Sequence, residues 1–142
     1  MPKLQRGDLD DNLGLRIRRA HGAVQRHFAE HFAHLGLTQK QVSILWLVGD
    51  NPQAAQTDLA EALDMDRATT MALVHGLEKR ALLSRSPSPT DKRRIGFRLT
   101  PDGATSLAEA KAAIAQHEAW LKARFDKDEL KMIENLLARI YR

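Results

Sequence analysis

The first quarter of the chain carries a stripe of mostly apolar residues that recur every three or four positions, as on one face of a helix. The stripe comprises Leu13, Ile17, Ala20, Val24, Phe28, His31 and Leu35. This spacing predicts a long amphipathic helix over residues 13–36, with Gly36 as its C-terminal stop.

The next segment, residues 42–48, is apolar almost all round, which is typical of a helix buried in a domain core. Thr38 can cap its N-terminus, and Asn51-Pro52 ends it. We therefore expect a buried helix directly after the amphipathic one.

Two short helical patterns follow, over residues 57–63 and 67–79, with Asp66 as the N-cap of the second. Two short helices joined by a few residues form a helix-turn-helix. The second helix of such a motif can enter the major groove of DNA, so this segment predicts a nucleic-acid-binding element.

Residues 82–86 and 95–99 alternate apolar with polar or basic side chains and flank a turn that contains Pro87 and Pro89. This pattern predicts a two-stranded hairpin. A hairpin directly after a helix-turn-helix forms the wing of a winged helix. Its basic tip, residues 90–94, could reach the adjacent minor groove.

Thr100-Pro101-Asp102 marks a helix start, and the helical pattern runs from there to about residue 124. Asp126 caps a last amphipathic helix. The expected fold is therefore mainly α with a small β-hairpin: one domain, residues 1–142, with a winged-helix lobe at 38–100. The flanking segments, 8–36 and 101–142, are expected to form dimerisation helices, because a two-fold dimer matches a palindromic DNA site.

Composition and charge agree with a small globular domain. The 142 residues carry a formal net charge of +4 and no cysteine, which excludes disulfides, thiolate zinc sites and thiol chemistry. The sequence contains no apolar run of membrane-spanning length and no signal-peptide pattern, so we expect a cytoplasmic protein. Neither a nucleophile motif nor a glycine-rich phosphate loop is present, so we expect no enzyme activity and no cofactor.

Five segments in order carry a family resemblance. They are residues 37–38, 59–69, 77–83, 91–94 and 99–103, which read LT, LAEALDMDRAT, LEKRALL, DKRR and LTPDG. Together they resemble the MarR (multiple-antibiotic-resistance regulator) transcription factors. The resemblance implies a homodimeric winged-helix repressor or activator that a small, often aromatic and anionic, ligand releases from DNA.

The resemblance also implies a role for Asp91 and Arg93 at the wing tip, where the Arg enters the minor groove and the Asp orients it. The sequence departs from the family pattern at Ala72 and Gly76, where polar residues are common. It also departs at Thr70, where an apolar residue is usual, and at Ala81, where Gly usually closes the helix. We expect Thr70 to face the core.

The candidate DNA-binding residues belong to the helix-turn-helix and the wing, and two of them, Lys79 and Arg85, are expected to contact phosphates. They are Gln56, Thr57, Arg67, Thr69, Met71, His75, Lys79, Arg85, Asp91, Arg93 and Arg94.

Four of the six histidines crowd the first helix, and His31 lies within its apolar stripe. Three interpretations stay open: buried or interfacial histidines hydrogen-bonded to neighbours, an effector site, and a metal site based on His27 and His31 at i, i+4. No cysteine or close carboxylate completes a metal-ligand set, so no metal is assigned. The candidate ligand-binding residues are Arg16, His21, His27, His31 and Trp46, and the expected effector is an aromatic acid or its thioester.

The sequence therefore favours a ligand-responsive, sequence-specific transcriptional regulator, most simply a repressor. The alternative is an architectural, nucleoid-type protein that binds DNA without sequence preference and has no effector. The low charge of the second helix of the helix-turn-helix favours the alternative. The polar residues on the apolar stripe of the first helix favour the regulator.

Overall fold

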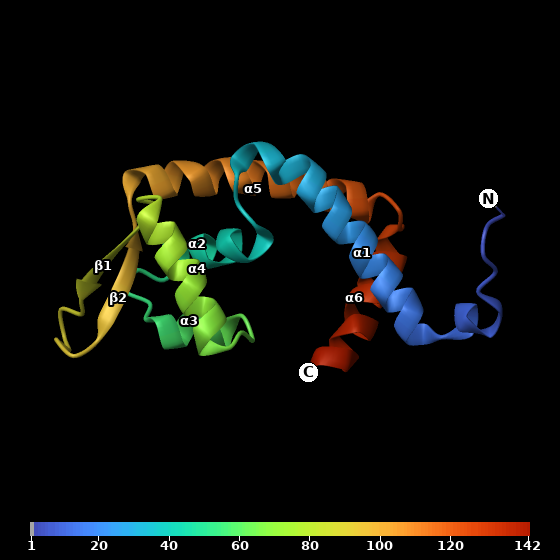
Figure 1. The fold of residues 1–142 in the computed structure, drawn as a ribbon, viewed down its shortest axis with the longest axis horizontal. Helices are drawn as coiled ribbons and strands as arrows, with labels where there is room; N and C mark the ends of the chain where they lie inside the picture. Colours follow the sequence, from blue (N-terminus) through green and yellow to red (C-terminus); the bar gives the residue numbers. More distant parts are fainter. Residues whose placement is uncertain (1) are drawn as a thin grey trace. The chain divides into compact units, whose positions relative to one another are not determined.

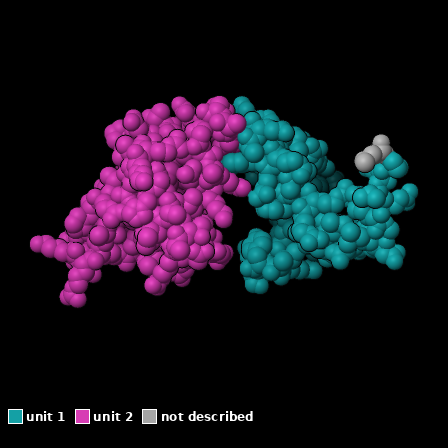
Figure 2. Space-filling view, viewed as in Figure 1, with its two compact units in different colours: residues 1–31, 115–142 teal, residues 32–114 magenta. Residues whose placement is uncertain are grey.

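A computed structural model describes residues 2–142 of the chain (Figure 1). Its elements are η1 (Gly7–Asp11), α1 (Leu13–Phe32), η2 (Ala33–Leu35), α2 (Gln39–Asp50), α3 (Gln56–Ala62), α4 (Arg67–Lys79), β1 (Leu83–Pro87), β2 (Ile95–Leu99), α5 (Pro101–Lys122) and α6 (Lys127–Tyr141). The chain divides into two compact units, distinguished by colour in Figure 2. Unit 1 contains residues 1–31 and 115–142, and unit 2 contains residues 32–114.

The core of unit 2 forms around α2. The Thr38 hydroxyl accepts from the Gln41 backbone N–H, and the Gln41 side chain accepts from the Thr38 N–H, so a capping box starts this helix. Four α2 residues and the inward residues of α3 and α4 are almost fully buried: Val42, Ile44, Leu45, Val48, Leu59, Val74 and Leu77. The expectation of a buried second helix is confirmed.

The hairpin of unit 2 is antiparallel, with Leu83 opposite Leu99 and Pro87 opposite Ile95. Its second strand is also fixed to the loop before α3. Phe97 donates its N–H to the Ala54 carbonyl and accepts from the Gln53 N–H, both at 3.0 Å. This bridge ties the wing to the loop that leads into the helix-turn-helix.

The end of the wing, the start of α5 and the chain before β1 lie in close contact. Thr100 Oγ1 accepts from the Gly103 N–H at 2.9 Å, which caps α5 as predicted, and donates to the Ala81 carbonyl at 2.6 Å. Ala81 itself has a left-handed backbone with φ of 57°, the conformation for which Gly is the usual residue. Gly103 lies so close to the chain before β1 that a Cβ there would be 2.0 Å from the Leu82 carbonyl oxygen.

Unit 1 combines α1, the end of α5 and α6. Asp126 and Glu129 form a capping box at the start of α6, as the sequence predicts for Asp126. No residue of α6 is buried within the described chain. Five of its large apolar side chains are strongly exposed: Met132, Leu136, Leu137, Ile140 and Tyr141.

Some boundaries differ from the predicted ones. The α-helical part of α1 ends at Phe32, and a 3₁₀ turn continues it to Gly36, whose left-handed backbone provides the predicted stop. The turn η1 was not predicted, because the sequence before residue 12 is polar and shows no periodicity. Among the described residues, no helix is long and apolar enough to cross a membrane.

Candidate functional site

The N-terminus of α4 is fixed by Asp66. Its carboxylate accepts from the Thr69 backbone N–H at 2.7 Å and from the Thr69 hydroxyl at 2.9 Å. These hydrogen bonds hold the pKa of Asp66 below its usual range. The neighbouring Thr70 is fully buried and donates its hydroxyl to the Asp66 carbonyl, so the prediction that Thr70 faces the core is confirmed.

The exposed face of α4 carries most of the side chains predicted to contact bases. Arg67, His75 and Lys79 are exposed, and Met71 is 48% exposed, whereas Thr69 is half-buried. The structure also places Gln56 and Thr57 in the first turn of α3, within the same unit. All the predicted DNA-binding residues thus belong to unit 2, on α3, α4 and the wing.

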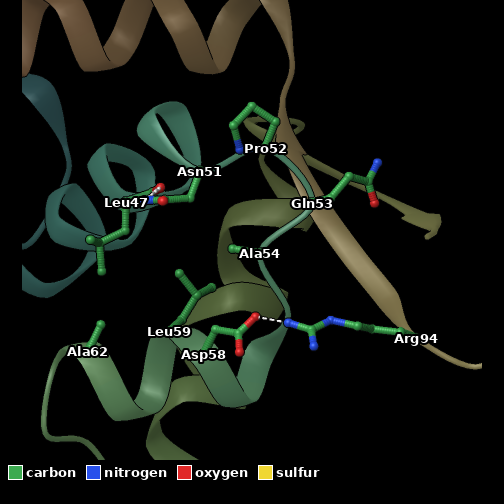
Figure 3. A pocket seen from close by; sticks show the side chains of 9 residues that line it. All are labelled: Leu47, Asn51, Pro52, Gln53, Ala54, Asp58, Leu59, Ala62 and Arg94. Atoms are coloured by element: carbon green, nitrogen blue, oxygen red, sulfur yellow. Dashed lines mark hydrogen bonds and ion pairs between the residues drawn. The ribbon is translucent and has the colours of Figure 1, made fainter. Parts of the chain in front are cut away.

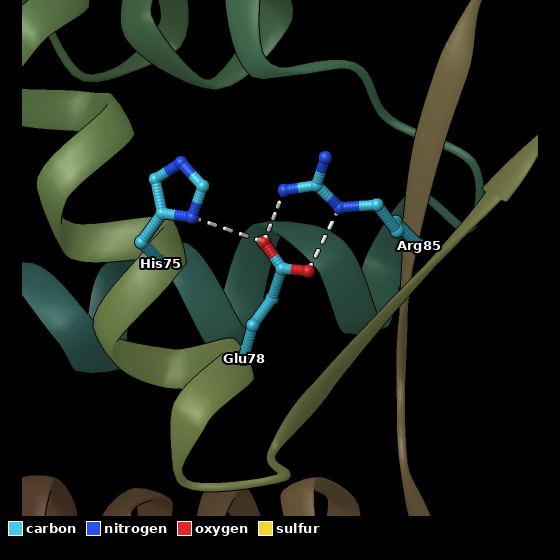
Figure 4. Close-up of polar contacts among 3 residues, drawn as sticks. All are labelled: His75, Glu78 and Arg85. Carbon is cyan, nitrogen blue, oxygen red and sulfur yellow. Dashed lines mark hydrogen bonds and ion pairs between the residues drawn. The ribbon is translucent and has the colours of Figure 1, made fainter.

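Arg85 of β1 is held by a carboxylate of α4. Its Nε and Nη2 donate to the two oxygens of Glu78 at 2.8 and 2.6 Å, and His75 Nδ1 lies 3.8 Å from the same carboxylate (Figure 4). The Arg85 hydrogen bonds hold the pKa of Glu78 below its usual range. Arg85 was predicted to contact phosphate, but Glu78 balances its charge within the protein. The two hydrogen bonds from the Arg85 guanidinium also hold β1 against α4.

The wing tip is a tight hydrogen-bonded turn. The Asp91 carboxylate accepts from the backbone N–H of Arg93 at 3.0 Å, and the Arg94 N–H donates to the Asp91 carbonyl at 3.0 Å. The Ser88 N–H donates to the Arg94 carbonyl at 2.7 Å and closes the loop. Asp91 thus orients Arg93 through its backbone, and the Arg93 side chain remains exposed at the tip.

Arg94, the next residue, is directed toward α3. Its guanidinium forms an ion pair with Asp58 across a surface cavity of about 380 Å³ lined by α2, α3 and the loop between them (Figure 3). The Ala55 N–H and then Arg94 lower the pKa of Asp58. Sequence reasoning missed Asp58, because an ion pair between residues 36 positions apart leaves no local pattern.

The predicted ligand-binding residues fall in three places. Arg16 and His21 line an apolar cavity of about 590 Å³ in unit 1, formed by α1, the end of α5 and α6. His27 and His31 belong to a stack of rings in the same unit. Trp46 lies in unit 2, where the Lys111 ammonium is 4.7 Å from the centre of its ring.

The ring stack joins α1 to α5 within unit 1. His27 lies 3.8 Å from Trp120 and 3.9 Å from His31, measured between ring centres, and its Nδ1 is 2.7 Å from Nδ1 of His117. The Arg124 guanidinium lies 4.2 Å from the centre of the Trp120 ring. His117 and Trp120 were missed, because sequence spacing within α1 says nothing about its partners on a helix some 90 residues later.

A hydrogen bond between two Nδ1 atoms requires one ring to donate and the other to accept. The two rings therefore cannot both be in the cationic imidazolium form, in which each Nδ1 carries a hydrogen. Burial lowers the pKa of both His27 and His117 from the ordinary value of 6.5. The nearby His31 lowers both pKa values further, whereas the carboxylates of Glu30 and Glu118 oppose the shifts of His27 and His117 respectively. Within residues 2–142 no group of three His, Cys, Asp or Glu side chains could hold a metal ion.

An antiparallel hairpin fixed beside two short helices, with exposed basic and polar residues on the second helix and at the hairpin tip, defines a winged helix-turn-helix. Similarity to known proteins supports this class. A family model described as the MarR family matches residues 35–94.

Two further comparisons cover nearly the whole chain. A relative assigned to regulation of the hcr operon in Thauera aromatica is 33% identical over 143 residues, which covers 100% of this chain and 86% of the relative. The transcriptional repressor CouR bound to a 23-mer DNA duplex is 34% identical with a TM-score of 0.90, covering 99% of this chain and 100% of that one.

A structure of CouR bound to p-coumaroyl-CoA is also 34% identical, with a TM-score of 0.88 and 99% coverage of both chains. The chain belongs to the MarR family of transcriptional regulators.

Proposed function

We propose that the protein represses transcription as a homodimer on a palindromic operator, and that an aromatic acid or its acyl thioester releases it from DNA. The observation that carries the DNA-binding part is the wing tip. There the Asp91 carboxylate fixes the backbone of an exposed Arg93, on a hairpin tied to the recognition helix α4. The similar repressor seen on a DNA duplex supports the same role for unit 2.

The surface of unit 1 supports the homodimer. Helix α6 exposes five large apolar side chains, and one of them, Leu137, also lines the apolar cavity that α6 forms with α1. Exposed apolar side chains gathered on one helix, beside an apolar cavity, mark an interaction site. A second copy of the chain can cover it by two-fold symmetry, and the two α4 helices can then engage half-sites about 34 Å apart.

The effector class is supported by the similar repressor bound to p-coumaroyl-CoA. In this chain, α1 carries Arg16, His21, His27 and His31, and cationic and aromatic side chains of this kind suit an anionic aromatic ligand. A coupling of about 1–3 kcal/mol between ligand and DNA binding is enough to release an operator.

The test of the DNA-binding mode is Arg93→Ala. We expect it to weaken binding of an operator duplex by about 1–3 kcal/mol and to lower the salt dependence by roughly one counterion, because the side chain contacts DNA and not the protein core. Fluorescence anisotropy at several salt concentrations measures both quantities on a duplex selected from a random library with the wild-type protein.

Arg142→Ala, which removes the same charge from the exposed C-terminal residue, is the matched control and should leave affinity unchanged. Wild-type affinity for Arg93→Ala, with an unchanged circular dichroism spectrum, would show that the wing tip does not contact DNA.

A further inference from the structure

The arginines of α1 border a second hollow in unit 1, separate from the apolar cavity except at one edge. This hollow has a volume of about 710 Å³ and is lined by Arg16, Arg18, Arg19 and Arg26 around a floor of small residues, Ala20, Gly22 and Ala23. Four guanidinium groups therefore border this surface, and Nη1 of Arg26 lies over Gly22, 3.3 Å from the position that a Cβ would take there.

The charge of this hollow is largely uncompensated. None of the ion pairs of the described residues includes Arg16, Arg18, Arg19 or Arg26. Arg16 Nε donates only to the backbone carbonyl of Asp10 at 3.0 Å. The hydrogen bond from Arg6 is the main cause that lowers the pKa of the Asp10 carboxyl, and the charges of Arg19 and Arg16 add to it.

Guanidinium forks bind phosphate oxygens bidentately, and an uncompensated group of four suits a ligand with several phosphates. The volume lies within the range of about 300–1,000 Å³ that small-molecule sites occupy. Ala23 and Arg26 of the hollow lie one turn or less before His27, so the hollow adjoins the ring stack of His27 and Trp120 on α1.

We propose that this hollow, the α1 arginine site, binds the phosphates of the coenzyme A portion of an acyl thioester, whose aromatic acyl group extends toward the histidine-bearing face of α1. The inference rests on the proposed function, because it requires an acyl thioester as effector. It goes beyond that function because it assigns recognition of the coenzyme A portion to Arg19 and Arg26. The protein would then distinguish the coenzyme A thioester from the free acid.

The test compares two ligands on two proteins by isothermal titration calorimetry. The ligands are p-coumaroyl-CoA and p-coumaroyl-pantetheine, which has the same acyl group and thioester but lacks all the phosphates. The variant is Arg19→Ala/Arg26→Ala, and Lys127→Ala/Arg142→Ala removes the same charge from the two ends of α6 as a control. Arg16 is left intact because it also lines the apolar cavity.

We expect wild type to bind p-coumaroyl-CoA at least about tenfold more tightly than the pantetheine thioester, because each charge-assisted hydrogen bond to phosphate contributes to affinity. The arginine variant should lose most of this preference while binding the pantetheine thioester as wild type does, and the control should keep it. A preference that survives in the arginine variant would overturn the assignment.

Two other outcomes would also overturn it, and each is distinguishable. If neither thioester binds wild type or releases it from DNA, the proposed effector class is wrong as well. If Arg19→Ala/Arg26→Ala weakens operator binding without ligand by tenfold, with little change in the preference between thioesters, the hollow is a DNA-contact surface. Circular dichroism spectra identical to wild type confirm that these exposed substitutions leave the fold intact.

Discussion

Gly103→Ala is expected to destabilise the winged helix by roughly 3 kcal/mol, the upper end of the cost of overpacking. The added Cβ would lie 2.0 Å from the Leu82 carbonyl oxygen, which also accepts a hydrogen bond from the Thr100 N–H. The new Cβ has no rotatable bond and would meet only backbone atoms of Leu82, so no side-chain rotation can relieve the clash. The wing and α5 would have to separate where they meet.

Urea denaturation of the purified protein measures this effect. Gly76→Ala is the matched control, because Gly76 is also helical and its Cβ would meet only the Gln41 side chain at 3.9 Å. Replacing a helical Gly with Ala in open space should stabilise the protein by about 0.5–1 kcal/mol. Equal free energies of unfolding for the two variants would contradict the close approach of α5 to the chain before β1.

Leu137→Asp is expected to convert the dimer to monomer and to abolish operator binding at concentrations where wild type is bound. Leu137 is 44% exposed in the single chain and lines the apolar cavity of unit 1, so a second copy that covers this face would bury the new carboxylate. A charge buried without a partner costs several kcal/mol, roughly the stability of a small interface.

Sedimentation equilibrium measures the mass, with Asn135→Asp as control, since it adds the same charge to an exposed polar position of α6. The control should remain dimeric. A wild type that sediments as a monomer at micromolar concentration, or a Leu137→Asp variant that remains a dimer, would rule out dimerisation through this face.

Local signals made much of the fold predictable. The caps at Thr38, Asp66, Thr100 and Asp126 each depend on residues within three positions, and the structure has all of them. The hairpin followed from alternation, although β1 begins one residue later than the pattern indicated. The 3₁₀ turns η1 and η2 were not predicted, because short turns carry no periodicity.

Side-chain contacts between different helices and strands could not be read from the sequence. The pairing of Arg94 with Asp58 and of Arg85 with Glu78 shows that two of the predicted DNA contacts also bind carboxylates of the protein. The His27–His117 hydrogen bond joins positions 90 residues apart. The five predicted ligand-binding residues looked like one site because four of them share a helix, whereas the structure distributes them over two units.

The most direct test of a ligand-responsive repressor is a DNase footprint on the DNA upstream of its own coding sequence, with and without p-coumaroyl-CoA. A specific homodimer should protect one short palindrome, and the thioester should remove that protection without affecting the fold. Protection that extends along the whole fragment without boundaries, and that does not change with the thioester, would contradict this account and indicate an architectural DNA-binding protein.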